Sequence, residues 1–221
     1  MRRPPPLRAH EPAAIVTEEE AMRRCFDLAL ESARLGGYPI AAVVTRGGRI
    51  VVEATNRVSQ ERDVTRHAEV VALAEAQKAL ATTSLDDCTL FSNVEPCALC
   101  AYAIRETRVR KVAFSLSSPL MGGFSRWNIL GDERLSQAMP DVFAPPPVVL
   151  PHFLCQEADR ALRQASLIFW TGARSRGLLR VESRPGGLEP EPPIRLRRVL
   201  RDTTMRVLRR RVFDRFGRGK A

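Results

Sequence analysis

In the first part of the chain, hydrophobic side chains recur with the period of a helix. Apolar residues follow at three- and four-residue spacing after residue 20, at Met22, Cys25, Phe26, Ala29 and Ala33. The preceding run from Thr17 to Glu20 has the pattern of a capping box, in which a hydroxyl and a carboxylate satisfy each other's backbone N–H groups. Two glycines at 36 and 37 are typical of a helix end. We therefore predict an amphipathic helix over residues 17–35.

The pattern then changes to the two-residue period and β-branched content of strands. Two apolar runs, at 40–44 and 50–52, flank Gly47-Gly48 and predict a β-hairpin. Residues 57–66 are polar and predict a loop. Further helices are predicted at 67–80, 97–105 and 157–169, and further strands at 89–92, 112–114 and 148–150. This order predicts an α/β fold, a three-layer α/β/α sandwich around a mixed five-stranded sheet.

The excess of positive charge lies in the last part of the chain. The 221 residues include 35 Lys and Arg against 25 Asp and Glu, and residues 171–221 hold 15 of the basic and 5 of the acidic ones. Residues 1–170 are therefore neutral. We predict a flexible segment over 1–16, one catalytic domain over 17–170, and a basic extension over 171–221 that starts with a linker and is partly helical. Any nucleic-acid contact is expected from that extension.

Composition also bears on the compartment. No apolar run reaches the length that spans a bilayer, and the first residues lack the apolar segment of a secretory signal, so we expect a cytoplasmic protein without a membrane span. Five cysteines are scattered along the chain, apart from one C-x-x-C pair at 97 and 100. In a reducing compartment such a pair indicates metal binding or redox chemistry.

Two short motifs stand at the starts of predicted helices. His67-Ala68-Glu69 opens one helix, and Pro96-Cys97-Ala98-Leu99-Cys100 opens another, thirty residues later. Parallel strands joined by a crossover helix would bring both helix starts to one edge of the sheet. One imidazole and two thiolates suit Zn²⁺, which accepts mixed nitrogen and sulfur ligands in a tetrahedron. Three protein ligands leave the fourth position for water, whose pKa zinc lowers toward ~7.

Glu69 is the candidate acid–base group. It follows His67 by two positions, an offset from which it does not easily share the metal but can face the bound water. A carboxylate there can take a proton from water and return protons to a ring nitrogen and a departing amine. The alternative interpretation is a solvated carboxylate on the helix surface.

The combination of H-x-E with P-C-x-x-C resembles the signature of the cytidine deaminase-like zinc deaminases, over residues 18–170. The Glu95-Pro96-Cys97 context is similar to the branch with tRNA adenosine, guanine and cytosine deaminases, whereas the loop 119–130 differs from that of the tRNA enzymes. The resemblance implies a homodimer, with Zn²⁺ held by the helix-start ligands and proton transfer by Glu69. These ligands would be His67, Cys97 and Cys100.

Substrate contacts are predicted at Asn56, Ala68, Phe124 and Trp127. Asn56 follows the hairpin, where the resemblance implies a hydrogen bond to the substrate ring; the alternative interpretation is a turn residue. Phe124 and Trp127 could stack on a flat ring or pack over the core. Cys155 remains an alternative fourth metal ligand. His152 has no potential catalytic or metal-binding partner at a spacing typical of a motif.

These observations predict a zinc-dependent hydrolytic deaminase of a nucleobase, nucleoside or similar small amino-heterocycle, releasing ammonia. One alternative is a tRNA-specific adenosine deaminase, in which the base is extruded into the pocket. The neutral catalytic region favours a small substrate, because RNA affinity comes largely from Lys and Arg contacts to phosphates. A further alternative is a non-catalytic zinc-binding scaffold subunit.

Overall fold

A computed structural model describes residues 15–181, so most of the predicted flexible segment 1–16 and the possible helix beyond residue 181 lie outside the described residues. A five-stranded sheet forms the middle layer, in the order β2-β1-β3-β4-β5. β1 pairs antiparallel with β2 and β3, whereas β3, β4 and β5 are parallel, which confirms the predicted mixed sheet. The strands are β1 (Ala41–Arg46), β2 (Arg49–Thr55), β3 (Cys88–Val94), β4 (Lys111–Leu116) and β5 (Val148–Leu150).

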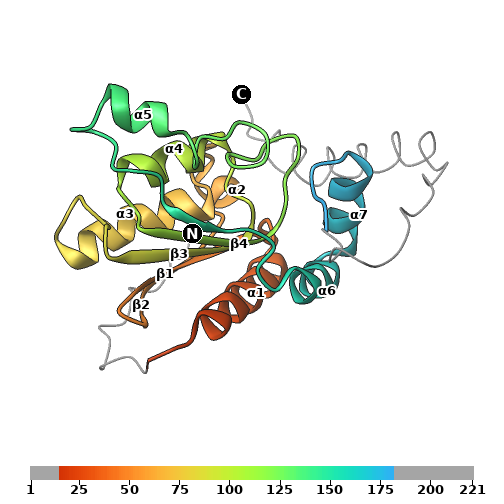
Figure 1. The fold of residues 1–221 in the computed structure, drawn as a ribbon. Helices are drawn as coiled ribbons and strands as arrows, with labels where there is room; N and C mark the ends of the chain where they lie inside the picture. Colours follow the sequence, from red (N-terminus) through yellow and green to blue (C-terminus); the bar gives the residue numbers. More distant parts are fainter. Residues whose placement is uncertain (1–14, 182–221) are drawn as a thin grey trace, which may run out of the picture.

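Helices cover both faces of this sheet (Figure 1). On one face, α3 (Ala68–Leu80) and α4 (Ala98–Glu106) pack over a core that includes Val44, Leu90 and Val112. On the other, α1 (Glu18–Arg34) and α6 (Cys155–Ala165) pack over a core that includes Val43 and Phe91. Successive strand residues point to opposite faces, so neighbours such as Val43 and Val44 enter different cores. The three-layer sandwich is confirmed.

The first helix follows its sequence pattern. The Thr17 hydroxyl accepts a hydrogen bond from the Glu20 backbone N–H at 3.2 Å, and the Glu20 carboxylate accepts one from the Thr17 N–H at 2.7 Å. This reciprocal pair is the predicted capping box. The apolar stripe of α1, from Met22 to Ala29, is buried against the sheet. The sequence therefore predicts both the start and the orientation of this helix.

Three segments differ from the predicted elements. A short helix, α2 (Val58–Glu61), lies in the predicted loop, and α5 (Glu133–Ala138) begins where the Asp132 carboxylate caps the Arg134 N–H at 2.9 Å. The single helix predicted over 157–169 is two helices, α6 and α7 (Leu167–Ser175). Ser166 separates them because its backbone is extended and its hydroxyl caps the Phe169 N–H at 3.2 Å.

The structure also corrects the predicted start of the linker at residue 171. Helix α7 continues through Ser175, and Ala173 and Leu179 are buried in the core on the α1 face. Arg180 then forms an antiparallel bridge with Ser117, with backbone hydrogen bonds of 2.9 and 3.1 Å in the two directions. Residues 171–180 therefore belong to the folded domain, because their apolar side chains complete its core.

Two crossovers fix the edge at which the helices α3 and α4 begin. β2, β3 and β4 run in the same direction, and the chain passes from β2 through α3 to β3 and from β3 through α4 to β4. Both helices therefore start beyond the carboxyl ends of strands, at one edge of the sheet, as the motif spacing predicts.

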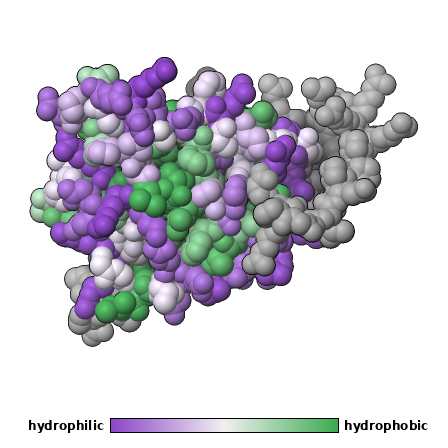
Figure 2. All heavy atoms as spheres, viewed as in Figure 1, coloured by the Kyte–Doolittle hydropathy of each residue, from purple (hydrophilic) through white to green (hydrophobic). Residues whose placement is uncertain are grey.

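The molecular surface carries apolar area at the level of the sheet. Figure 2 shows hydrophobic residues gathered across the middle of the face seen in Figure 1. Val148 of the edge strand β5 is 59% exposed, as expected for a strand with one unpaired side. No helix among residues 15–181 is both long and apolar enough to cross a bilayer.

Candidate active site and metal centre

The predicted metal ligands meet at the starts of α3 and α4. His67 and Cys97 are the N-cap residues of these helices, and neither side chain caps a backbone N–H of its helix. Both side chains are therefore available to face one another. Nδ1 of His67 lies 3.4 Å from Sγ of Cys97 and 3.4 Å from Sγ of Cys100, and the two sulfurs are 3.5 Å apart.

This donor set fits Zn²⁺. Zinc bonds of about 2.0–2.3 Å in a tetrahedron require about 3.6 Å between nitrogen and sulfur ligands and about 3.8 Å between two sulfurs. The observed separations are within a few tenths of an ångström of those values. Among residues 15–181 the only metal-competent cluster is His67, Cys97 and Cys100, all within 4.8 Å of one another. Cys155 does not join it, so no fourth protein ligand is supplied from the described residues.

The two thiols of the cluster titrate in opposite directions. The hydrogen bond between the sulfur atoms of Cys97 and Cys100, together with His67, lowers the pKa of Cys97 to about 4. The same bond and burial raise the pKa of Cys100. The Cys97 thiolate in turn raises the pKa of His67. One thiolate is therefore already favoured before any cation binds, and a divalent ion would favour the second.

Glu69 lies against this cluster and is 3% exposed, so it is not a solvated surface carboxylate. Its Oε2 is 3.5 Å from Sγ of Cys100, and its Oε1 accepts a hydrogen bond from the Ser92 hydroxyl at 3.4 Å. Burial raises the pKa of Glu69 to about 7. A carboxyl group with a pKa near neutrality can both accept and donate a proton during one reaction cycle.

Asn56 and Ala68 lie at the same sheet edge. Asn56 directly follows β2 and is 4% exposed; its Oδ1 accepts from the Val58 N–H at 3.1 Å, a bond typical of a turn asparagine. The amide nitrogen is not used in that bond. Ala68 is the first residue of α3 and has no exposed surface. Their contacts with a substrate remain predictions.

The two predicted aromatic contacts lie in different surroundings. Phe124 is half-buried, and its ring packs edge-on against Phe114 with 6.0 Å between centroids. Trp127 is 56% exposed, with the Arg126 guanidinium 5.3 Å from its ring centroid. Phe124 thus packs over the core, and its ring also lines a pocket near the end of β4. Trp127, in contrast, is a surface side chain. Substrate stacking by either ring remains a prediction.

Glu95 is a site residue that the sequence did not reveal. Its buried carboxylate accepts hydrogen bonds from the backbone N–H groups of Ser118 (2.7 Å), Phe124 (3.1 Å) and Ser125 (2.6 Å). The Ser125 hydroxyl adds a fourth at 2.8 Å. One side chain therefore holds both ends of the loop 117–125. The available signal was its place directly before Pro96-Cys97.

That loop also fixes the backbone at Pro96 and Cys97. Gly122 forms an antiparallel bridge with Cys97, and the Gly123 N–H donates to the Pro96 carbonyl at 2.7 Å. A Cβ atom on Gly122 would lie 2.1 Å from Oε1 of Glu95, so a larger residue there would displace the Glu95 carboxylate. Glu95 therefore acts on the position of Cys97 through this loop.

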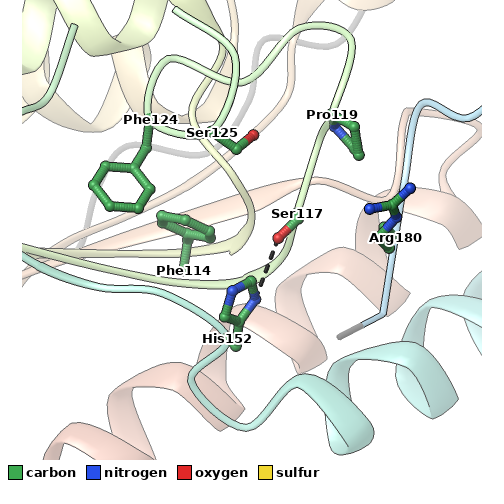
Figure 3. A pocket seen from close by; sticks show the side chains of 7 residues that line it. All are labelled: Phe114, Ser117, Pro119, Phe124, Ser125, His152 and Arg180. Atoms are coloured by element: carbon green, nitrogen blue, oxygen red, sulfur yellow. Dashed lines mark hydrogen bonds between the residues drawn. The ribbon is translucent and has the colours of Figure 1, made fainter. Parts of the chain in front are cut away.

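A pocket of about 220 Å³ lies beyond the end of β4, and residues of the loop line part of it (Figure 3). Phe114 and Phe124 form its apolar wall, and Ser117, His152 and Arg180 lie at its polar side. His152 and Arg180 come from segments for which no sequence pattern indicated a site.

Known proteins resemble this chain over the region just described. Residues 15–116 match the family model of the cytidine and deoxycytidylate deaminase zinc-binding region. A tRNA-specific adenosine deaminase of Aquifex aeolicus is 38% identical over 46% of this chain and 68% of its own length. A guanine deaminase of Bacillus subtilis is 38% identical over 45% of this chain and 65% of its own length.

A solved structure extends the likeness to the fold. A protein from a study of A-to-I editing by tRNA A34 deaminases at the wobble position of transfer RNA shares a TM-score of 0.56 and 26% identity. That comparison covers 65% of this chain and 99% of the other. The chain belongs to the cytidine deaminase-like zinc deaminases, and its enzyme class is that of the hydrolytic deaminases.

Proposed function

We propose that this protein binds one zinc ion through His67, Cys97 and Cys100 and hydrolytically deaminates a nucleobase ring. The observation that carries the proposal is the buried carboxylate of Glu69 beside a three-ligand cluster. Zinc, when bound, would act as a Lewis acid and lower the pKa of a water molecule at the site. A scaffold subunit would have no use for a buried carboxyl group with a pKa near 7 at that position.

The chain's own groups account for the proton transfers. Glu69 accepts a proton from the attacking water as the new carbon–oxygen bond forms at the amino-bearing ring carbon. It passes protons to the ring nitrogen and to the amine, so that the carbon–nitrogen bond breaks and ammonia leaves. Ser92 holds one oxygen of Glu69, and Cys100 contacts the other. The amide nitrogen of Asn56 would orient the ring by a hydrogen bond.

The proposed substrate is a small amino-heterocycle: a base, nucleoside or nucleotide. Residues 15–181 contain 20 Lys and Arg against 19 Asp and Glu, so the folded part has no general attraction for a polyanion. The decisive experiment is an ammonia-release screen of guanine, cytosine, adenine, their nucleosides and 5′-monophosphates, and a tRNA anticodon stem-loop. Release from a free base, nucleoside or mononucleotide supports the small-substrate proposal, whereas release from the stem-loop alone, or from none of these compounds, would contradict it.

A tRNA adenosine is the second candidate, favoured by the similarity to a tRNA-specific adenosine deaminase and by the basic residues after 181. Truncation after residue 181 tests this, since a cut at 172 would remove part of α7 and the buried Leu179. A small substrate should keep its kcat/KM after truncation, with little salt dependence. A salt-sensitive loss of two orders of magnitude would favour RNA, because salt weakens phosphate contacts.

We also propose a homodimer in a reducing, cytoplasmic setting. Leu99 and Tyr102 lie on one face of α4 and are 46% and 43% exposed, close to the exposed Met121 of the loop. Apolar side chains grouped in this way favour a protein partner. A reducing compartment would keep Cys97 and Cys100 available as metal ligands. Light scattering of the wild type and of Leu99→Glu should give a dimeric and a smaller mass, respectively.

A further inference from the structure

The pocket beyond β4 and the metal cluster lie one strand apart. β3 and β4 are adjacent and parallel, and their last pair is Val94 with Leu116. Cys97 follows the first of these strands, and Ser117 follows the second. Because neighbouring strands are about 4.8 Å apart, the metal cluster and the pocket lie beside each other at the same edge of the sheet.

The pocket contains a cationic side chain. Arg180 lines it (Figure 3), and the two backbone hydrogen bonds with Ser117 hold its main chain in place. No salt bridge found among residues 15–181 involves Arg180. Glu95, the carboxylate that contacts the pocket residue Ser125, is already satisfied by its N–H and O–H donors. Within the described part of the chain, the guanidinium is therefore placed to bind an anion.

Ser117 and His152 add a further donor. The Ser117 hydroxyl lies 3.2 Å from Nδ1 of His152. If the hydroxyl donates to Nδ1, a neutral imidazole carries its proton on Nε2; if Nδ1–H donates, the hydroxyl hydrogen is free. Either arrangement leaves one O–H or N–H for a ligand. The pocket thus offers at least one donor besides the guanidinium.

The backbone holds His152 in an uncommon conformation. His152 has φ +60°, in the left-handed region, and it is exposed. The next residue fixes it there: the Phe153 N–H donates to the Phe114 carbonyl at 2.9 Å, and the Ser115 hydroxyl donates to the Phe153 carbonyl at 2.7 Å. Left-handed residues other than glycine persist where the surroundings enforce them, often at binding sites.

The size of the pocket indicates what it holds. A cavity of about 220 Å³ is smaller than the ~300 Å³ at which pockets begin to enclose a whole small-molecule ligand. It therefore accommodates one group of a larger ligand. An arginine fork recognises carboxylate or phosphate, and phosphate is the anion that nucleosides carry.

We infer that this pocket binds a phosphate group of the substrate, whose base lies at the metal cluster. The inference rests on the proposed deaminase function and specifies its substrate as phosphorylated, either a mononucleotide or an RNA. Arg180 holds the phosphate, with Ser117 and His152 as the second donor.

Binding measured without turnover tests the inference. Zinc-loaded Glu69→Gln protein is titrated calorimetrically with adenosine, guanosine and cytidine, with their 5′-monophosphates, and with an anticodon stem-loop RNA. The same titrations are made after Arg180→Ala and after the control Arg176→Ala, an exposed arginine at the end of α7. Thermal melting checks the fold of each variant, and Arg180→Lys shows whether the planar fork is needed.

One monophosphate should bind about 10- to 100-fold more tightly than its nucleoside, the range expected for charged hydrogen bonds. Arg180→Ala should remove this advantage, and Arg176→Ala should retain it. If the Arg180-dependent gain occurs only with the stem-loop, the pocket holds a backbone phosphate of RNA. Equal binding of nucleosides and phosphorylated ligands, or a gain that survives Arg180→Ala, would overturn the inference.

The outcome for the pocket is separable from that for the enzyme. Normal ammonia release from a nucleoside, without any phosphate advantage, leaves the deaminase proposal intact and removes the phosphate site. An Arg180-dependent phosphate advantage without ammonia release from any compound removes the deaminase proposal instead.

Discussion

The metal cluster and the phosphate pocket lie at the same sheet edge but are built in different ways. Cys97 and Cys100 are 30 and 33 positions from His67, and the cluster with Glu69 is largely buried. The pocket combines Ser117, His152 and Arg180 from three separate segments, and the last two are exposed. Reactive groups whose pKa values must shift need burial, whereas a group that recognises a charged ligand stays near solvent.

The largest effect is expected from removal of a metal ligand. Cys97→Ala should reduce zinc from about one ion per chain to well under a tenth, because two remaining ligands cannot hold the ion. Metal analysis of purified protein measures this. Cys25→Ala is the matched control: it removes a fully buried cysteine outside the cluster and should keep full zinc. Full zinc in Cys97→Ala would show that the ligand assignment is wrong.

Loss of the acid–base group should stop turnover without loss of metal. Glu69→Gln should lower kcat by at least ~10²-fold, since each proton transfer loses its carrier. Glu75→Gln, farther along α3 and paired with Lys78, should remain active. Ammonia release and zinc content are measured on the same preparations. Wild-type rates in Glu69→Gln would exclude this residue from the reaction.

Glu95 connects the two regions, so its removal should disturb both. Glu95→Ala leaves three backbone N–H groups of the loop 117–125 without their acceptor, at a cost of about 3–5 kcal/mol in the free energy of unfolding. Amide hydrogen exchange should accelerate in that loop. Glu106→Ala, an exposed carboxylate at the end of α4, should change stability by less than about 0.5 kcal/mol. If amide hydrogen exchange in the loop were unchanged in Glu95→Ala, Glu95 would not be the residue that holds the loop.

The burial of Glu69 should make metal-free protein less stable as pH rises. Its pKa is raised from 4.5 to about 7, so between these values the folded state holds a proton that the unfolded state releases. The free energy of unfolding of the wild type relative to Glu69→Gln should therefore fall between about pH 4.5 and pH 7, by up to about 3 kcal/mol. The difference between the two proteins separates this effect from titration of Cys97. A difference that does not change with pH would contradict the raised pKa.

The smallest effect on stability is expected at the pocket. Arg180→Ala removes an exposed side chain but keeps the backbone bridge to Ser117, so the free energy of unfolding should change by less than about 0.5 kcal/mol. Zinc content should also be unchanged. Chemical denaturation and metal analysis measure both. A loss above about 2 kcal/mol would show that Arg180 supports the fold, and the contrast between the two regions would fail.

Short-range patterns determined most of the fold and the metal cluster. The capping box and apolar stripe of α1, the hairpin, and the two helix starts depend on residues a few positions apart. His67, Glu69, Cys97 and Cys100 could be placed together because crossovers between parallel strands bring successive helix starts to one edge. The local pattern was insufficient at Ser166, where a serine hydroxyl caps a new helix inside an apparently continuous one.

Only the tertiary structure decided the surroundings of the cluster. The Glu95 carboxylate bonds to backbone groups 23 to 30 positions away, and any residue type can supply a backbone N–H. Arg180 lines a pocket because Leu179 is buried and its own backbone pairs with Ser117, contacts that depend on the whole packed domain. Local sequence thus determined the candidate metal ligands and the candidate acid–base group. Long-range packing determined which other groups stand beside them, because a loop's backbone bonds leave no periodic signal in the sequence.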